Sequence, residues 1–262
     1  MLWPAAGFTK RDAADYYIAV ARALLPHLVD RPLTVLRFPE GVEGPRWYQT
    51  RCRGPFRTRR VAGRTGTPQD YCLVDDVDDL LRLVNMGALE LHPLLSRGDD
   101  VTRATHVVFD LDPGPPADVV DCVPVALALR ERFPSATVKT SGSVGLHVSV
   151  PLPELLPFEE TKALARDVAR SLGGNVIDDP RRGARAGNVF VDWNQNDRTK
   201  SVVAPYSLRA LPWPTVSTPL GWDELERVRS ADELVFLPRD VLARLPAQEQ
   251  AEQGRDESDR DH

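Results

Sequence analysis

The stretch VVFDLDPGP at residues 107–115 places two carboxylates at the end of an apolar run. In a β-strand, residues i and i+2 point to the same face, so Asp110 and Asp112 are expected to project together, about 7 Å apart along the backbone. Two carboxylates that close repel each other unless a proton or a cation lies between them. Hard divalent cations prefer oxygen ligands, so the stretch predicts a Mg²⁺ or Mn²⁺ site at the mouth of a buried strand. A solvated turn is the alternative, because Asp before Pro-Gly is common in turns.

A small-residue turn separates the two strands expected within VKTSGSVGLHVSVPL, residues 138–152. Backbone N–H groups of such a turn can cradle phosphate oxygens. His147, which follows on a strand, can donate to a phosphate or carry a proton. The turn consists of Ser141, Gly142, Ser143 and Gly145. A hairpin turn with a core histidine is the alternative interpretation.

A third carboxylate, Asp192, ends the apolar run of NVFVDWNQN at 188–196 as Asp110 ends its own. Two cations bridged by carboxylates stabilise both the attacking and the leaving oxygen of a phosphoryl transfer. Arg209 follows in SVVAPYSLRA, and arginine forms paired hydrogen bonds with phosphate. Together these features predict nucleotidyl transfer from a metal-bound triphosphate. A metal-dependent phosphodiesterase would share the acids but would not explain a triphosphate-binding turn.

Charge is spread unevenly along the 262 residues, whose net charge is −5. Residues 247–262 hold six acidic and two basic side chains, and this polar segment is expected to be a disordered tail. By contrast, seven arginines and no acid lie between Arg46 and Arg64, in RWYQTRCRGPFRTRRVAGR. This stretch predicts a phosphate-binding surface, with a solvated basic loop as the alternative.

The composition, with 42% hydrophobic and 27% charged residues, is typical of globular proteins. No stretch approaches the roughly 18 apolar residues of a membrane span, and no secretory signal is visible. We therefore expect no membrane partner and a cytoplasmic protein. Cys52, Cys72 and Cys122 show neither a CxxC pair nor a disulfide framework, so we expect no disulfide and a reducing compartment.

Helices and strands are intermixed along the chain, which predicts an α/β or α+β fold. Helical spacing of apolar residues predicts helices over 9–25, 76–86, 117–133, 158–173 and 221–228. Strands are predicted over 33–38, 46–52, 88–92, 105–113, 187–196 and 201–210, with two more inside 136–152. An internal boundary is expected near 98–103.

Four segments in a fixed order carry a family resemblance. FDLDPG, TSGSVGLHV, VFVDWNQN and VAPYSLRA closely resemble the polymerase domain of bacterial ATP-dependent DNA ligase D, in the archaeo-eukaryotic primase superfamily. ALELHP at 88–93 and FTKRDAADYY at 8–17 are similar to the same family, so the resemblance covers about residues 1–240. It implies an α+β primase-polymerase fold, in which a smaller N-terminal α/β part packs against an RRM-like antiparallel catalytic sheet. Residues 1–246 would form this domain, as a stand-alone monomer without a ligase domain.

Matched positions imply the roles of individual residues. Asp110, Asp112 and Asp192 would be catalytic and bind two Mg²⁺ or Mn²⁺ ions. The residues implied to bind the incoming NTP or dNTP are His92, Ser141, Gly142, Gly145, His147, Arg185, Gln195 and Arg209. The residues implied or expected to bind DNA are Lys10 (near a 5′-phosphate), Arg46, Trp47, Tyr48, Arg51 and Arg53. Aromatic side chains stack on exposed bases while arginines hold phosphates, although core packing of the two aromatics is the alternative.

The activity implied by the resemblance is extension of primer 3′-OH ends with ribo- or deoxyribonucleotides. Its setting would be gap filling during non-homologous end joining at the nucleoid, with Ku and a separate ATP-dependent ligase. A catalytically weak DNA-end-binding module and a primase are the alternatives. Val144 stands where family members usually carry lysine, which would remove a contact with the triphosphate worth about 1–2 kcal/mol. The start at MLWP is shorter than in relatives, so either it is trimmed or one DNA contact is missing.

Overall fold

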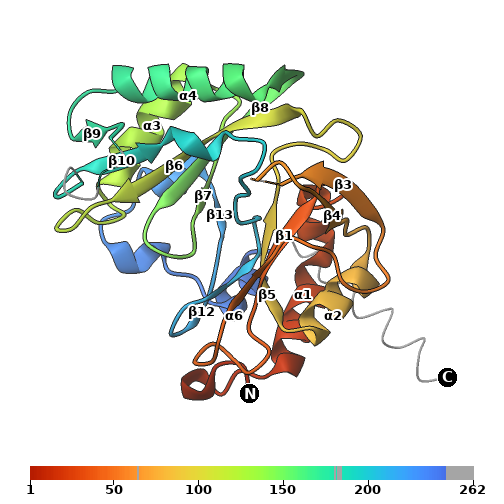
Figure 1. The fold of residues 1–262 in the computed structure, drawn as a ribbon. Coiled ribbons are helices and arrows are strands. Elements are labelled where there is room, and N and C mark those ends of the chain that lie inside the picture. The colour runs from red at the N-terminus through yellow and green to blue at the C-terminus, as the bar shows by residue number, and fades with distance from the viewer. Residues whose placement is uncertain (64, 180, 182–184, 246–262) are drawn as a thin grey trace.

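The computed structural model describes residues 1–63, 65–179, 181 and 185–245 (Figure 1). The expected tail at 247–262 lies outside these residues. Two β-sheets form the framework, and helices cover their outer faces (Figure 1). This mixed architecture confirms the predicted α+β class.

The N-terminal sheet has five strands, with β1 hydrogen-bonded to β2, β4 and β5, and β3 to β4. These strands are β1 (Leu33–Arg37), β2 (Trp47–Gln49), β3 (Thr58–Ala62), β4 (Pro68–Cys72) and β5 (Ala88–Pro93). The accompanying helices are α1 (Lys10–Leu24) and α2 (Val77–Asn85). The start of α1 is fixed by Thr9, whose hydroxyl accepts the Asp12 N–H while the Asp12 carboxylate accepts the Thr9 N–H.

The C-terminal sheet has six strands in the order β13-β7-β8-β6-β10-β9, all antiparallel except β9 with β10. Its strands are β6 (Arg103–Pro113), β7 (Thr137–Thr140), β8 (Leu146–Pro157), β9 (Val176–Ile177), β10 (Val189–Asp192) and β13 (Pro219–Leu220). Two helices, α3 (Cys122–Arg132) and α4 (Phe158–Ser171), pack on one face (Figure 1). The opposite face carries Asp110, Asp112 and Asp192 together with buried apolar residues such as Phe190.

The segment 201–210 links the two sheets. Its Ala204 N–H donates to the Leu91 carbonyl of β5 at 2.8 Å, and its Arg209 side chain donates to the Ser141 carbonyl between β7 and β8. A single cluster of buried apolar residues runs through both halves of the chain. The prediction of a strand over all of 201–210 is wrong, because only β11 (Leu208–Ala210) forms, paired with β12 (Pro214–Val216). Pro205 has no N–H to donate, and Tyr206 has a positive φ of 65°, which breaks the extended backbone.

Other elements differ in length from the prediction. The helix expected over 117–133 begins only at Cys122, after a turn in which the Asp118 carboxylate accepts the Val120 N–H. The late helix is limited to α5 (Trp222–Leu225), while α6 (Pro238–Arg244) was not predicted. None of the helices within the described residues is long and apolar enough to cross a membrane.

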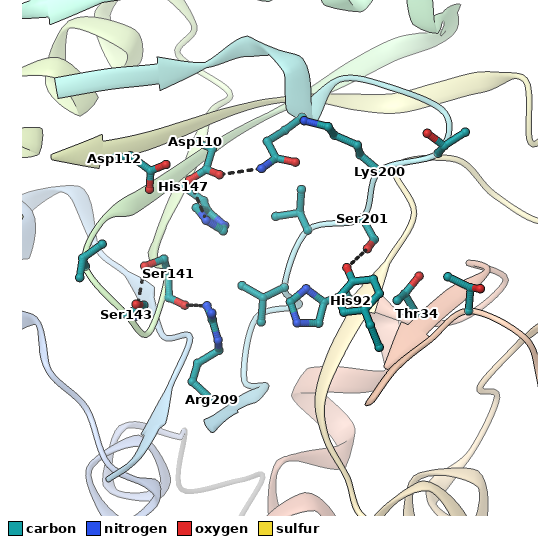
Figure 2. A pocket seen from close by; sticks show the side chains of 17 residues that line it. Thr34, His92, Asp110, Asp112, Ser141, Ser143, His147, Lys200, Ser201 and Arg209 are labelled. Atoms are coloured by element: carbon teal, nitrogen blue, oxygen red, sulfur yellow. Dashed lines mark hydrogen bonds and ion pairs between the residues drawn. The ribbon is translucent and has the colours of Figure 1, made fainter. Parts of the chain in front are cut away.

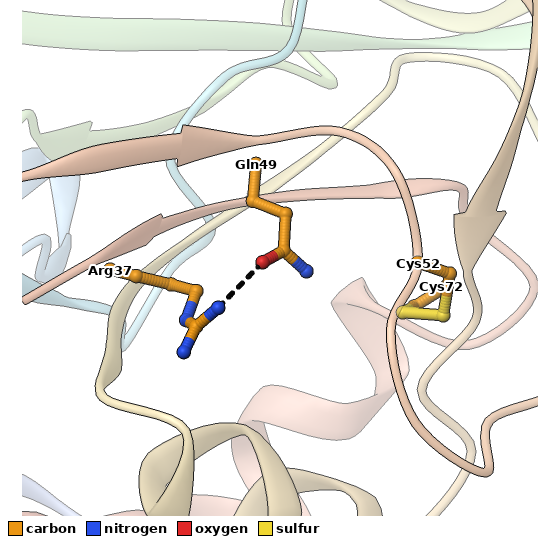
Figure 3. Close-up of a disulfide and its surroundings, with 4 residues drawn as sticks. All are labelled: Arg37, Gln49, Cys52 and Cys72. Atoms are coloured by element: carbon orange, nitrogen blue, oxygen red, sulfur yellow. Dashed lines mark hydrogen bonds between the residues drawn. A yellow bond between two sulfur atoms is a disulfide. The ribbon is translucent and has the colours of Figure 1, made fainter. Parts of the chain in front are cut away.

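Cys52 and Cys72 form a disulfide, so the prediction of no disulfide is wrong (Figure 3). The two residues are 20 positions apart in sequence, but their Cα atoms are 4.7 Å apart because the chain turns back through β3 and β4. The Cys52 N–H also donates to the Asp70 carbonyl at 2.6 Å. The bond therefore ties the arginine-rich segment to β4, while Cys122 is free and buried.

Candidate active site

A cavity of about 470 Å³ lies between the two sheets (Figure 2). One wall carries Asp110 and Asp112 of β6 and His147 of β8. The opposite wall carries Thr34 of β1 and His92 of β5. The predicted metal-binding and nucleotide-binding residues that line this cavity are His92, Asp110, Asp112, Ser141, His147, Gln195 and Arg209.

The strand register places the three predicted carboxylates together. Asp192 of β10 lies directly opposite Asp110 of β6, and Asp112 lies opposite Phe190. Residues directly opposite each other on neighbouring antiparallel strands project from the same face. The prediction that Asp110 and Asp112 project together is confirmed by the cavity that both line.

Each carboxylate has a polar partner from the protein. His147 Nε2 lies 3.1 Å from one oxygen of Asp110, and the Gln195 amide donates to the other at 3.0 Å. An Arg185 guanidinium nitrogen is 3.6 Å from Asp112. The Lys200 ammonium is 4.0 Å from Asp192. Arg185 and Gln195, predicted from their nearness to Asp192 in sequence, therefore both contact the carboxylate row.

Burial and mutual repulsion separate the titrations of these acids. Burial, followed by the charges of Asp110 and Asp192, raises the pKa of Asp112 to about 7. Burial also raises the pKa of Asp192, with a further contribution from Asp110. Burial opposes ionisation of Asp110 too, but His147 and the Gln195 hydrogen bond outweigh it and hold the pKa of Asp110 below its usual value. Asp110 is therefore the most readily ionised of the three, and its negative charge contributes to the raised pKa values of Asp112 and Asp192.

Among the described residues, no three His, Cys, Asp or Glu side chains form a cluster compact enough to hold a metal ion. The carboxylates are instead engaged with the cationic and amide partners named above. Their chemistry nevertheless suits a hard divalent cation, because all three offer oxygen ligands. Burial, and after it the charges of Asp110 and Asp192, raises the pKa of Asp112, and a bound cation would offset both effects.

The turn between β7 and β8 is closed by Ser141. Its hydroxyl oxygen accepts the N–H groups of Ser143 and Gly145, each at 3.1 Å, so these two groups stabilise the turn. Gly142 has a φ of 69°, and a Cβ there would lie 2.7 Å from Arg209. A Cβ on Gly145 would lie 2.0 Å from the Leu111 carbonyl oxygen. The two glycines thus allow the turn to approach β6 and Arg209 closely.

Glu90, which the sequence analysis did not identify, joins two of the predicted nucleotide-binding residues. Its buried carboxylate lies 2.9 Å from His92 Nε2 and 3.1 Å from Arg209 Nε. The Arg209 contact is an ion pair without hydrogen-bond alignment, whereas the Ala210 N–H donates to Glu90 at 3.0 Å. Burial opposes ionisation, but the His92 hydrogen bond and the nearby charges lower the pKa of Glu90 below its usual value. Glu90 therefore fixes the side chains of His92 and Arg209 from behind.

The comparisons with known proteins agree with this geometry. The family model described as "LigD, primase-polymerase domain" matches residues 9–251. The chain belongs to the LigD primase-polymerase family. It is 36% identical, over 94% of its length, to the multifunctional non-homologous end joining DNA repair protein LigD of Mycobacterium tuberculosis. It is 29% identical over 92% of its length to the bifunctional LigD protein of Bacillus subtilis.

A solved structure shows the same fold. The polymerase domain of Mycobacterium tuberculosis ligase D, in complex with DNA, is 34% identical, with a TM-score of 0.85 over 93% of this chain and 91% of that domain. The chain spans about a third of the length of the mycobacterial LigD proteins, 36% for that of Mycobacterium tuberculosis. The predicted primase-polymerase fold is confirmed.

A second groove, of about 720 Å³, opens beside the cavity of this LigD-type domain. It is lined by four of the predicted DNA-binding residues, which are Trp47, Tyr48, Arg51 and Arg53. Trp47 is 60% and Tyr48 63% exposed, which excludes core packing for both. Tyr48 also lines the first cavity, so the two hollows are neighbours. Arg46 precedes β2 and is exposed.

Lys10 lies apart from both hollows, at the start of α1, where its ammonium donates to the Asn85 carbonyl at 3.0 Å. The arginine-rich segment is also less uniform than its sequence. Arg57 is paired with Asp30 and Asp75 at 2.6 Å each, so the fold supplies counter-charges that the segment itself lacks. Arg51 and Arg53 line the groove together with Arg37 and Arg60.

Proposed function

We propose that the chain is a nucleotidyltransferase that extends primer 3′-OH ends with nucleotides bound in the cavity between the sheets. The observation that carries this proposal is the pairing of opposite charges within one cavity. The carboxylates of Asp110 and Asp112 and the cations of Lys200 and Arg209 all line this cavity. A metal-bound triphosphate needs both kinds of charge. Membership of the LigD primase-polymerase family supports the same activity.

Asp110, Asp112 and Asp192 would hold two Mg²⁺ or Mn²⁺ ions. Their oxygens would serve as ligands in place of, or in addition to, the present contacts with His147, Arg185 and Lys200. When bound, such ions would lower the pKa of the primer hydroxyl and screen the charge of the triphosphate.

The residues of the chain itself would bind and orient the nucleotide. The primer 3′-hydroxyl loses its proton to solvent water and its oxygen bonds to the α-phosphorus, while the bond from the α-phosphorus to the bridging oxygen of the β-phosphate breaks and pyrophosphate leaves. Arg209 and Lys200 offer N–H donors to the departing charge, and the Ser141 hydroxyl hydrogen can donate to a phosphate oxygen. His92, whose Nε2 lies 2.9 Å from Glu90, would contact the nucleoside part from the opposite wall.

The second groove would take DNA. Its exposed Trp47 and Tyr48 suit stacking on unpaired bases, and Arg51 and Arg53 suit backbone phosphates. The Mycobacterium tuberculosis domain of similar structure is in complex with DNA, which supports this role. The substrate we propose is gapped or broken DNA, with Lys10 near its 5′-phosphate. Ku and a separate ligase would be the protein partners in end joining at the nucleoid, with the chain acting as a monomer.

Primer extension tests the proposal. The assay uses a gapped, 5′-phosphorylated DNA with Mn²⁺ and each NTP or dNTP in turn, with Asp110→Ala beside the unaltered protein. We expect extension by the unaltered protein and none by the variant, and the comparison of NTP with dNTP gives the sugar preference. Absence of extension together with tight DNA binding would refute the polymerase and identify an end-binding module instead.

A further inference from the structure

Lys139 belongs to the same cross-strand row as two of the carboxylates. The register pairs Lys139 of β7 with His147 of β8, His147 with Asp110 of β6, and Asp110 with Asp192 of β10. Four consecutive strands therefore present a lysine, a histidine and two aspartates side by side on one face. Lys139 is not among the residues that line the cavity, whereas His147 is. The Lys139 side chain therefore contacts His147 on the side of the ring away from the cavity.

The hydrogen bonds around Lys139 have only one consistent direction. The Ser217 hydroxyl donates its single hydrogen to the Thr140 carbonyl at 2.8 Å, so it can only accept from the Lys139 ammonium, 2.7 Å away. The same ammonium lies 2.8 Å from Nδ1 of His147. On the other side of the ring, Nε2 lies 3.1 Å from the Asp110 carboxylate, which accepts hydrogen bonds, so the single hydrogen of a neutral ring lies on Nε2 and Nδ1 accepts from Lys139. Burial lowers the pKa of Lys139 well below its usual value, but its terminal nitrogen has N–H groups for both Ser217 and Nδ1 in either charge state.

We propose that Lys139 is a positioning residue that fixes His147 in the tautomer with its hydrogen on Nε2. A neutral imidazole carries one hydrogen, so an occupied Nδ1 lone pair places that hydrogen on Nε2. Nε2 lies 3.1 Å from Asp110 and faces the cavity. His147 can then only donate toward the carboxylate row and the bound phosphates. This inference rests on the proposed function for its catalytic consequence, but the tautomer itself does not.

Nitrogen NMR of the unaltered, metal-free protein tests the tautomer directly. Histidine is labelled with ¹⁵N, and the His147 signals are assigned by their loss in His147→Gln. The five histidines of the chain keep the spectrum simple. We expect the hydrogen of the neutral ring on Nε2. A hydrogen on Nδ1 would overturn the proposal, whether or not the protein extends primers.

A double-mutant cycle tests the consequence for activity. Lys139→Met keeps an unbranched chain of similar length but removes the donor, and we expect kcat/KM for nucleotide addition to fall about tenfold, mainly through kcat. Adding Lys139→Met to His147→Gln should then cost nothing further, because the lysine acts only through the imidazole. Multiplicative losses in the double variant would overturn the proposal. An inactive protein with the Nε2 tautomer would instead refute the polymerase function and leave the assigned tautomer standing.

Discussion

Asp112→Asn is expected to stabilise the metal-free protein at neutral and alkaline pH. An unfolded aspartate ionises near pH 3.8, whereas burial and two neighbouring carboxylates raise the pKa of Asp112 to about 7 in the folded protein. Between these two values the folded state binds more protons than the unfolded state. The free energy of unfolding therefore falls as the pH rises from about 4 to about 7, and the penalty is complete above that window.

The size of the effect follows from the pKa change and the exposure of the side chain. A rise from 3.8 to about 7 corresponds to at most about 4 kcal/mol. The Asp112 side chain is 35% exposed, and solvent screening reduces this to about 1–2 kcal/mol. For a domain of this size, the thermal midpoint of the variant should exceed that of the unaltered protein by about 3–6 °C at pH 8.

Thermal unfolding followed by circular dichroism in EDTA, at pH 4 and pH 8, measures this difference. The difference in thermal midpoint between Asp112→Asn and the unaltered protein should be small at pH 4 and reach its full size at pH 8. Added Mn²⁺ should remove this difference, because it stabilises the unaltered protein more than the variant. Asp15→Asn, which removes an exposed carboxylate on α1, is the matched control and should show no such gap. A variant no more stable than the unaltered protein at pH 8 in EDTA would refute the reasoning.

Three further substitutions have distinct expected results. Glu90→Gln leaves the Arg209 guanidinium without its buried counter-charge and removes the carboxylate beside His92, so urea unfolding should show a loss of about 3 kcal/mol; a loss below about 1 kcal/mol would contradict this pairing. Val144→Lys adds a cation at a side chain that is 61% exposed and lines the cavity, so calorimetry should show ATP binding about 5–10-fold tighter, and an unchanged Kd would mean that the turn does not face phosphates. Cys52→Ser should lower stability by about 3 kcal/mol, and dithiothreitol should destabilise the unaltered protein but not this variant.

Local sequence patterns were sufficient for the elements with strong periodicity. Thr9 and Asp12 mark the start of α1 through a capping box, and alternation along 107–113 places Asp110 and Asp112 on one face. The helix cap and the strand alternation depend only on residues within a few positions of one another, so they can be recognised in the sequence alone. The motifs around Ser141 and Asp192 predicted residues that the fold then brings to one cavity or its edge.

Residues whose role depends on distant strands could not be predicted in the same way. Glu90 gains its role from Arg209, 119 positions away in sequence, and Lys139 from its register with His147. The strands β3 and β4 carry mainly polar residues and lack clear alternation, so their pairing was missed. The Cys52–Cys72 disulfide depends on that pairing and was missed with it. The sequence did contain one indication of the role of Lys139. Because Val138 is buried on one face of β7, alternation puts Lys139 on the other face, which is the face that carries His147.

The most direct test of the two-metal site is anomalous scattering from crystals grown with Mn²⁺ and a non-hydrolysable nucleoside triphosphate. We expect two manganese peaks among Asp110, Asp112 and Asp192, with the triphosphate reaching from them toward Arg209. Peaks elsewhere, or a triphosphate bound outside the cavity between the sheets, would show that these three aspartates do not form a two-metal site.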